Sequence, residues 1–205
     1  MKLAIFQVEE EILMCMAKLN GKVKTCVFIS GRGSNLKSLI KSSKITSFPA
    51  KICLVISNKK NAKGIQVAKT FNIPSKIIQT KDKKKFELEV LPILKKKKIK
   101  LICLAGFMKI LSSQFIKKFK FKIINIHPSL LPKYKGINTH KRVLQNKETY
   151  SGCTVHYVNS KLDSGKIILQ KKIKIKNKDT ENSLKRKILK IEHKIYPQAI
   201  KSILK

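Results

Sequence analysis

Two polar side chains, Asn125 and His127, stand two residues apart at the end of an apolar run, followed by Pro128. Residues two apart in a strand point to the same side, so these two side chains can converge. An amide donor beside an imidazole that can donate or shuttle a proton suits the stabilisation of a tetrahedral oxyanion. Asp163 is one of only three aspartates in the chain. Near His127 it would favour the charged imidazole and hold its tautomer, although Asp163-Ser164-Gly165 also fits a simple turn.

Two further turns follow apolar runs and could bind ligands. Ser30–Leu36 carries two glycines, which let backbone approach a ligand, and Ser34 and Asn35 are expected to cap the next helix. Free N–H groups at a helix start favour phosphate, although an ordinary strand-to-helix turn fits equally well. The second turn, Ala105–Leu111, could line a pocket for a flat ring or simply pack in the core.

Other catalytic patterns find little support. No serine lies in a nucleophile elbow, no Cys and His are paired by spacing, and the four histidines lack zinc-site spacing. Covalent and metal catalysis are therefore disfavoured, and we expect no metal. The five cysteines are isolated, which indicates reduced thiols and a cytoplasmic setting.

Short apolar runs alternate with helical patterns along the chain, which predicts the elements that position these turns. Strands are expected at 23–29, 52–57, 75–79, 99–104, 122–126, 154–158 and 166–175, and helices at 34–43, 62–71, 82–98, 112–119, 139–146 and 180–203. The alternation predicts an α/β fold: a doubly wound, mainly parallel sheet with helices on both faces and antiparallel strands added late in the chain. Ligands of such sheets bind beyond the carboxyl ends of the strands, which is where all three turns lie.

Residues 22–205 are predicted to form one domain, preceded by an N-terminal extension, residues 1–21. An apolar stripe in this extension could form a helix (Ile12, Leu13, Cys15, Met16 and Leu19). Alternatively, the extension is upstream sequence, with initiation at Met14 or Met16.

The net charge of +36 suggests a nucleic-acid partner. However, the chain contains only three arginines and no tryptophan, and its lysines are scattered over nearly every predicted helix and loop. Because aromatic platforms and an arginine-rich stripe are missing, we expect small-molecule substrates and no nucleic acid. No apolar run is long enough for a membrane span, so no membrane partner is expected either.

Seven pieces in order, from about Val23 onward, carry a resemblance to a known family. They are Ile29–Leu36 (ISGRGSNL), Ser57-Asn58, Leu104–Leu111 (LAGFMKIL), Asn125–Tyr134 (NIHPSLLPKY), Gly152–Val158 (GCTVHYV), Leu162–Gln170 (LDSGKIILQ) and Glu192–Pro197 (EHKIYP). The set closely resembles glycinamide ribonucleotide formyltransferase, a folate-dependent family of purine synthesis. The resemblance implies the formyltransferase fold and a formyl transfer in IMP biosynthesis. The amine of glycinamide ribonucleotide would attack 10-formyltetrahydrofolate directly, with the folate as co-substrate.

The resemblance also implies roles for individual residues. Asn125 and His127 would stabilise the oxyanion, with His127 as proton donor, and Asp163 would assist His127 and relay the proton. The ribonucleotide would be bound by its phosphate at Gly33, Ser34 and Asn35 and by its amine at Glu192. The folate would contact Met108, Lys109, Ile110, Leu111 and Asn125, with Lys83 near its glutamate tail and Val158 over the pteridine.

Two related activities remain as alternatives. Methionyl-tRNA formyltransferase resembles this chain in its catalytic trio, but it carries an additional C-terminal domain for which no room follows Gln170. Formyltetrahydrofolate deformylase carries a large N-terminal regulatory domain, which 21 residues cannot supply. The expected assembly is a monomer or a homodimer.

Overall fold

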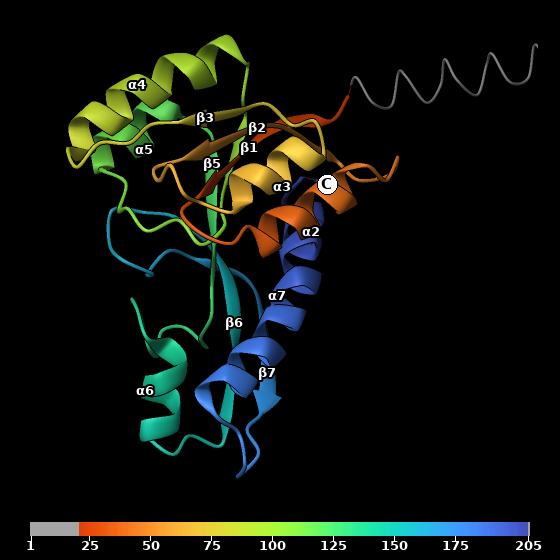
Figure 1. Ribbon diagram of the computed structural model, residues 1–205, viewed down its shortest axis with the longest axis vertical. Coiled ribbons are helices and arrows are strands. Elements are labelled where there is room, and N and C mark those ends of the chain that lie inside the picture. Colours follow the sequence, from red (N-terminus) through yellow and green to blue (C-terminus); the bar gives the residue numbers. More distant parts are fainter. Residues whose placement is uncertain (1–20, 205) are drawn as a thin grey trace, which may run out of the picture.

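The computed structural model describes residues 21–204, in which strands and helices alternate as far as the sixth strand (Figure 1). The strands are β1 (Val23–Ile29), β2 (Ala50–Ser57), β3 (Ser75–Ile77), β4 (Leu101–Leu104), β5 (Lys122–His127), β6 (Tyr150–Tyr157) and β7 (Ile167–Lys174). The helices are α2 (Ser34–Ser43), α3 (Gly64–Thr70), α4 (Lys83–Lys96), α5 (Ser113–Phe119), α6 (Thr139–Gln145) and α7 (Glu181–Ile203). The helix predicted from the stripe Ile12–Leu19 lies outside the described residues.

All seven strands join one sheet in the order β3-β2-β1-β4-β5-β6-β7. β1 to β5 pair in parallel, whereas β6 runs antiparallel to β5 and β7 antiparallel to β6. This confirms the predicted fold class. The strand order reverses between β1 and β4, so the ligand-binding crevice of such a sheet is expected beyond these two strands and β5.

Alternate residues of the central strands face two separate layers of helices. On β1, Val27 and Ile29 belong to the core shared with α2, α3 and α7, whereas Cys26 and Phe28 belong to the core shared with α4 and α5. Figure 1 shows α4 and α5 on one side of the sheet and α2, α3 and α7 on the other. A strand segment buried on both faces must be apolar, which explains the continuous apolar runs at residues 26–29 of β1 and 101–104 of β4.

Helix α7 packs along the sheet and forms hydrogen bonds to β4 and β5, near the candidate site. The fully buried Tyr196 places its hydroxyl 2.9 Å from the carbonyl oxygen of Leu104 and 3.2 Å from that of Ile124. These residues lie near the carboxyl ends of β4 and β5, where paired polar groups are needed because burial of an unpaired one is costly.

Most differences from the prediction affect the ends of elements. The largest is β6, which begins at Tyr150 rather than at the predicted Thr154. Its early residues include Gly152, where a Cβ would collide with the carbonyl oxygen of Lys171 on β7. Glycine usually weakens a strand, but close strand approach requires it here. None of the helices within residues 21–204 is both long and apolar enough to span a membrane.

Candidate active site

The carboxyl end of β5 carries Asn125 and His127 on the same side of the strand, as their spacing predicts. In the antiparallel register between β5 and β6, Asn125 lies opposite His156 and His127 opposite Thr154. His127 is only 5% exposed, so its ring is held by protein groups rather than by solvent. The pairing with β6 therefore places a second histidine, His156, beside the pair Asn125 and His127.

Asp163 reaches this cluster from the segment between β6 and β7, and it joins the two predicted catalytic residues. Its Oδ2 accepts a hydrogen bond from the Gly136 backbone at 2.8 Å and lies 3.3 Å from His127 Nδ1. Its Oδ1 accepts a hydrogen bond from Asn125 Nδ2 at 3.4 Å. The carboxylate thus accepts from two donors, lies beside His127 Nδ1, and is almost fully buried, with 9% of the side chain exposed. The structure brings Asn125, His127 and Asp163 together.

The ring of His127 faces an acceptor on each nitrogen. Nδ1 faces the Asp163 carboxylate, and Nε2 donates to the backbone carbonyl of Tyr134 at 2.9 Å. A carbonyl oxygen can only accept, so Nε2 carries a proton in this arrangement. When Nδ1 also carries one, both contacts become hydrogen bonds, which is the arrangement a proton donor needs.

His156 is the residue that sequence reasoning missed, because no role was assigned to it. Its Nδ1 donates to the carbonyl of Tyr157 at 2.8 Å, which leaves Nε2 as an acceptor for Asn125 Nδ2 at 3.2 Å. Burial lowers the pKa of His156, partly opposed by the Tyr157 carbonyl and by Asp163. A neutral His156 therefore orients the Asn125 amide, with its NH2 toward Asp163 and its oxygen turned away. Its importance follows from its place opposite Asn125 in the β5–β6 pairing. The sequence alone does not reveal this pairing, so it contained no signal for His156.

The turn after β1 differs from the prediction at the start of α2. Gly33, at φ 77°, occupies the N-cap position, and within the described residues no side chain caps this helix. The capping predicted for Ser34 and Asn35 is wrong, because the left-handed Gly33 occupies the N-cap position and both residues lie inside the helix. A Cβ on Gly33 would come within 2.5 Å of Gly64 Cα, so glycine is required there. The uncapped N–H groups of the first turn remain free to bind an anion.

Asn35 points toward α7 rather than toward the start of its own helix. Its Nδ2 donates to Glu192 Oε2 at 2.7 Å, whereas its Oδ1 is buried and has no hydrogen-bond partner among residues 21–204. Burial raises the pKa of Glu192, partly opposed by the amide of Asn35. Two acceptors, the free oxygen of Asn35 and the Glu192 carboxylate, therefore lie together and would suit a ligand that donates hydrogen bonds.

The turn after β4 presents apolar side chains to solvent. Met108 is 65% exposed and Ile110 53% exposed, whereas Leu111 is buried. Lys109 donates from Nζ to the carbonyl of Lys81 at 3.2 Å, which holds the turn against the segment that leads into α4.

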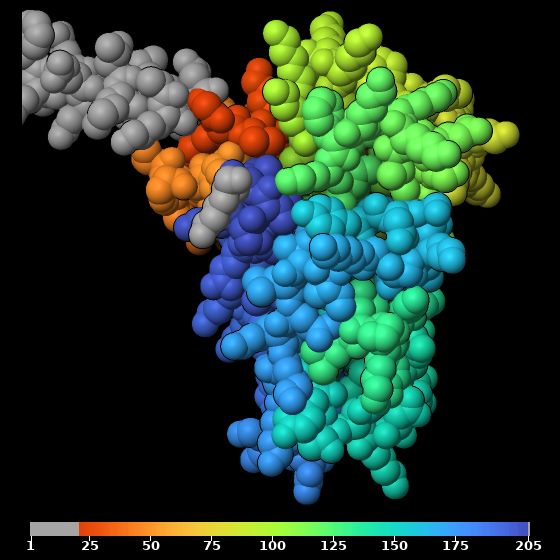
Figure 2. All heavy atoms as spheres, turned by 180° about the vertical axis from the view of Figure 1, so that it is seen from behind, coloured from red at the N-terminus to blue at the C-terminus, as the bar shows by residue number. Residues whose placement is uncertain are grey.

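The remaining two predicted folate residues lie at the edges of this region. Lys83 is the exposed first residue of α4, and Val158 is half-buried just after β6. From behind, the light-blue atoms between β6 and β7 separate the green atoms of α5 from the turquoise atoms of α6 (Figure 2). The segment that carries Val158 and Asp163 therefore lies between these two helices.

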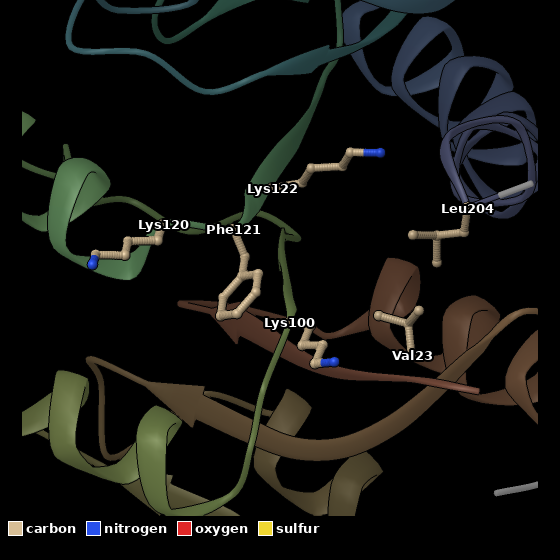
Figure 3. Close-up of a pocket in the computed structure, with 6 residues that line it drawn as sticks. All are labelled: Val23, Lys100, Lys120, Phe121, Lys122 and Leu204. Carbon is tan, nitrogen blue, oxygen red and sulfur yellow. The ribbon is translucent and has the colours of Figure 1, made fainter. Parts of the chain in front are cut away.

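A separate hollow of about 490 Å³ lies at the opposite edge of the sheet, where β1 and β5 begin and α7 ends (Figure 3). It is lined by Val23, Lys100, Lys120, Phe121, Lys122 and Leu204. None of the residues described in the cluster or in the two turns contributes to it. The candidate site is therefore recognised by its polar groups rather than by the size of a cavity.

Comparison with known proteins identifies close relatives. A family model described as formyl transferase matches residues 23–200. The trifunctional purine biosynthetic protein adenosine-3 of Gallus gallus is 43% identical over 185 residues, which cover 89% of this chain but only 18% of the chicken protein. Phosphoribosylglycinamide formyltransferase of Haemophilus influenzae is 41% identical over 181 residues, covering 87% of this chain and 85% of that protein.

Solved structures agree with these relatives. The crystal structure of phosphoribosylglycinamide formyltransferase from Brucella melitensis superposes with a TM-score of 0.85 at 37% identity, covering 89% of this chain and 96% of that one. The enzyme of the same name from Anaplasma phagocytophilum gives a TM-score of 0.83 at 39% identity, covering 89% of this chain and 86% of that one. The similarity thus extends over nearly all of the described residues.

Proposed function

Because this chain belongs to the formyl transferase family, we propose that it transfers the formyl group of 10-formyltetrahydrofolate to the amine of glycinamide ribonucleotide. The observation that carries the proposal is the buried cluster in which Asp163 contacts both Asn125 and His127 at the carboxyl end of β5. An amide donor and a proton-carrying imidazole together suit an oxyanion formed by direct attack on a formyl carbon. The names of the full-length bacterial relatives support this acceptor over the alternatives.

The chemical step needs no covalent enzyme intermediate. The substrate amine attacks the formyl carbon and forms the new C–N bond, and the formyl oxygen becomes an oxyanion that accepts hydrogen bonds from Asn125 and His127. The oxyanion then collapses, the bond from carbon to N10 of the folate breaks, and N10 leaves as an amine. N10 takes up one proton while the attacking nitrogen loses one, so the transfer is balanced. Asp163 relays this proton with His127, to which it is already close.

The acceptor substrate would bind between α2 and α7. Its phosphate would accept hydrogen bonds from the N–H groups of Gly33, Ser34 and Asn35 at the start of α2. Its amine would donate to Glu192 and to Oδ1 of Asn35, which has no hydrogen-bond partner within residues 21–204. Asn35 would therefore contact the phosphate through its backbone and the amine through its side chain.

The folate would bind on the other side of the cluster, along the turn after β4. Met108, Lys109, Ile110 and Leu111 would line the pteridine site, and the exposed apolar surface of Met108 and Ile110 supports this. Asn125 and Val158 would close it from the side of β5 and β6. Lys83 would meet the glutamate tail, because α4 begins beside the segment bound by Lys109.

The test compares acceptors with one enzyme preparation. Purified protein and 10-formyltetrahydrofolate are incubated with glycinamide ribonucleotide, with charged initiator tRNA, or with water alone. We expect formylation of the ribonucleotide only, in a cytoplasmic enzyme that needs no metal, nucleic acid or membrane. Formylation of tRNA would favour the tRNA formyltransferase alternative, and release of formate without an acceptor would favour the deformylase. Either result without ribonucleotide formylation would refute the proposal.

A further inference from the structure

Ser30 lies at the reversal of strand order, directly after β1, where it begins the proposed phosphate turn and contacts the turn after β4. β1 is flanked by β2 on one side and by β4 on the other. The residue is 6% exposed, so its hydroxyl must find partners within the protein. The backbone N–H of Ser30 donates to the carbonyl of Gly106, in the proposed folate turn, at 3.2 Å.

The hydroxyl of Ser30 joins three segments through two short hydrogen bonds. It donates to Asn58 Oδ1, just beyond β2, at 2.6 Å. It accepts from the backbone N–H of Met108, in the turn after β4, at 2.8 Å. Because a hydroxyl has one proton, its donation to Asn58 fixes the direction of the lone pair that Met108 uses. Asn58 thus orients the hydroxyl of Ser30, and the oriented hydroxyl in turn fixes the position of the Met108 backbone N–H.

We propose that Ser30 is a positioning residue that couples the ribonucleotide and folate sites through the chain Asn58–Ser30–Met108. The inference rests on the proposed function, because that function assigns the two turns to two different substrates. A phosphate held at Gly33 to Asn35 restrains the turn that begins at Ser30, and the same restraint then reaches Met108. Binding of the ribonucleotide therefore raises the affinity for the folate. By thermodynamic linkage, binding of the folate raises the affinity for the ribonucleotide by the same factor.

The experiment measures this coupling by binding rather than by turnover. Calorimetry gives the dissociation constant of tetrahydrofolate with and without saturating glycinamide ribonucleotide; this pair cannot react because the formyl group is absent. The wild type is expected to bind tetrahydrofolate about fivefold or more tightly when the ribonucleotide is present, the lower end of typical coupling between sites. In Ser30→Ala that ratio falls to about one, and the KM for 10-formyltetrahydrofolate rises about tenfold.

Two further variants keep the test informative should Ser30→Ala unfold. Asn58→Ala leaves Ser30 in place but removes the acceptor that orients its hydroxyl, so the binding ratio should fall there too. Asn58→Asp retains an acceptor oxygen of the same shape and should restore most of the coupling, which a loss of packing alone would not explain. Thr25→Val is the matched control, because it removes a buried hydroxyl that bonds the Val23 carbonyl at the other end of β1.

The outcomes separate the inference from the function on which it rests. Failure of the wild type to formylate the ribonucleotide would count against the proposed function. An active wild type whose binding ratio is already one would overturn the coupling. The same holds if Ser30→Ala and Asn58→Ala both keep the wild-type ratio while the proteins remain folded.

Discussion

Asp163→Asn is the substitution that tests the candidate site most directly, because it removes one charge and changes hardly any volume. The amide introduced at this position can still accept the hydrogen bond from Gly136 N–H through its one remaining oxygen. Its NH2 group then takes the place of Oδ1 and faces Asn125 Nδ2, which is a donor in the present arrangement, while His127 Nδ1 faces a neutral amide oxygen instead of a carboxylate. The fold is expected to survive, while the shared acceptor of the cluster is lost.

The expected loss in turnover follows from these contacts. The contact between Asp163 and His127 is the one that strengthens when the imidazole becomes charged in the transition state. A hydrogen bond to a charged group contributes about 1.5–3 kcal/mol, so the loss of the carboxylate should remove about 3 kcal/mol of transition-state stabilisation. Because each 1.36 kcal/mol is a factor of ten, turnover should fall about a hundredfold.

Single-turnover formyl transfer to glycinamide ribonucleotide provides the measurement, with tetrahydrofolate binding followed in parallel. Asp179→Asn is the matched control, since Asp179 forms an ion pair with Lys187 at the start of α7, 2.6 Å apart. The control is expected to lower stability at most and to leave turnover within about twofold. If Asp163→Asn keeps more than a tenth of the wild-type turnover, Asp163 does not serve as the acceptor of the reacting cluster.

Three other substitutions test separate features of the site. Burial lowers the pKa of His156, so the unfolded chain takes up the proton before the folded protein as pH falls through about 6.5. The free energy of unfolding therefore decreases below that pH. Urea unfolding of His156→Gln should show a smaller decrease in this free energy between pH 7.5 and 5.5 than the wild type does. Burial raises the pKa of Glu192, so its contribution is present at low pH and is lost as pH rises through the raised value. Glu192→Gln should thus be at least as stable as the wild type at pH 8, while its KM for the ribonucleotide rises about tenfold, and an unchanged KM would count against its role. Gly33→Ala places a Cβ against Gly64 at a left-handed φ, so unfolding by urea should show a loss of about 2 kcal/mol or more, together with weaker ribonucleotide binding.

The fold could be predicted because the central strands are buried on both faces. In β1, residues 26–29 contribute alternately to the two helical layers, which forces a continuous apolar run that is visible in the sequence. β6 was predicted too short because its early part includes Ser151 and Gly152, which are selected by local packing against β7 rather than by an apolar pattern. The capping residues of α2 are wrong in the prediction for a related reason, since a left-handed glycine at the N-cap leaves no polar side-chain signature.

The site could be predicted only as far as its residues share one element. Asn125 and His127 lie on one strand, so strand periodicity was sufficient to bring them together. Asp163 is separated from them along the chain, and its position depends on how β6 pairs with β5 and where the chain turns back to β7. The register between β5 and β6 cannot be read from the sequence. Asp163 is therefore assigned only through the family resemblance, and His156, whose position depends on the same register, is assigned no role.

The hydrogen bonds of the cluster also indicate how it would favour an oxyanion over a neutral carbonyl. Asn125 Nδ2 donates to His156 at 3.2 Å and to Asp163 at 3.4 Å, and His127 Nε2 donates to Tyr134 at 2.9 Å. A substrate oxygen can gain these donors only by replacing protein acceptors. A neutral formyl oxygen is a poorer acceptor than a carboxylate and gains little from the exchange, whereas the charged oxygen of the transition state competes well. The longest of these bonds, from Asn125 to Asp163, is the least costly to exchange, so the same amide would bind substrate weakly and the transition state strongly, which is the condition for catalysis.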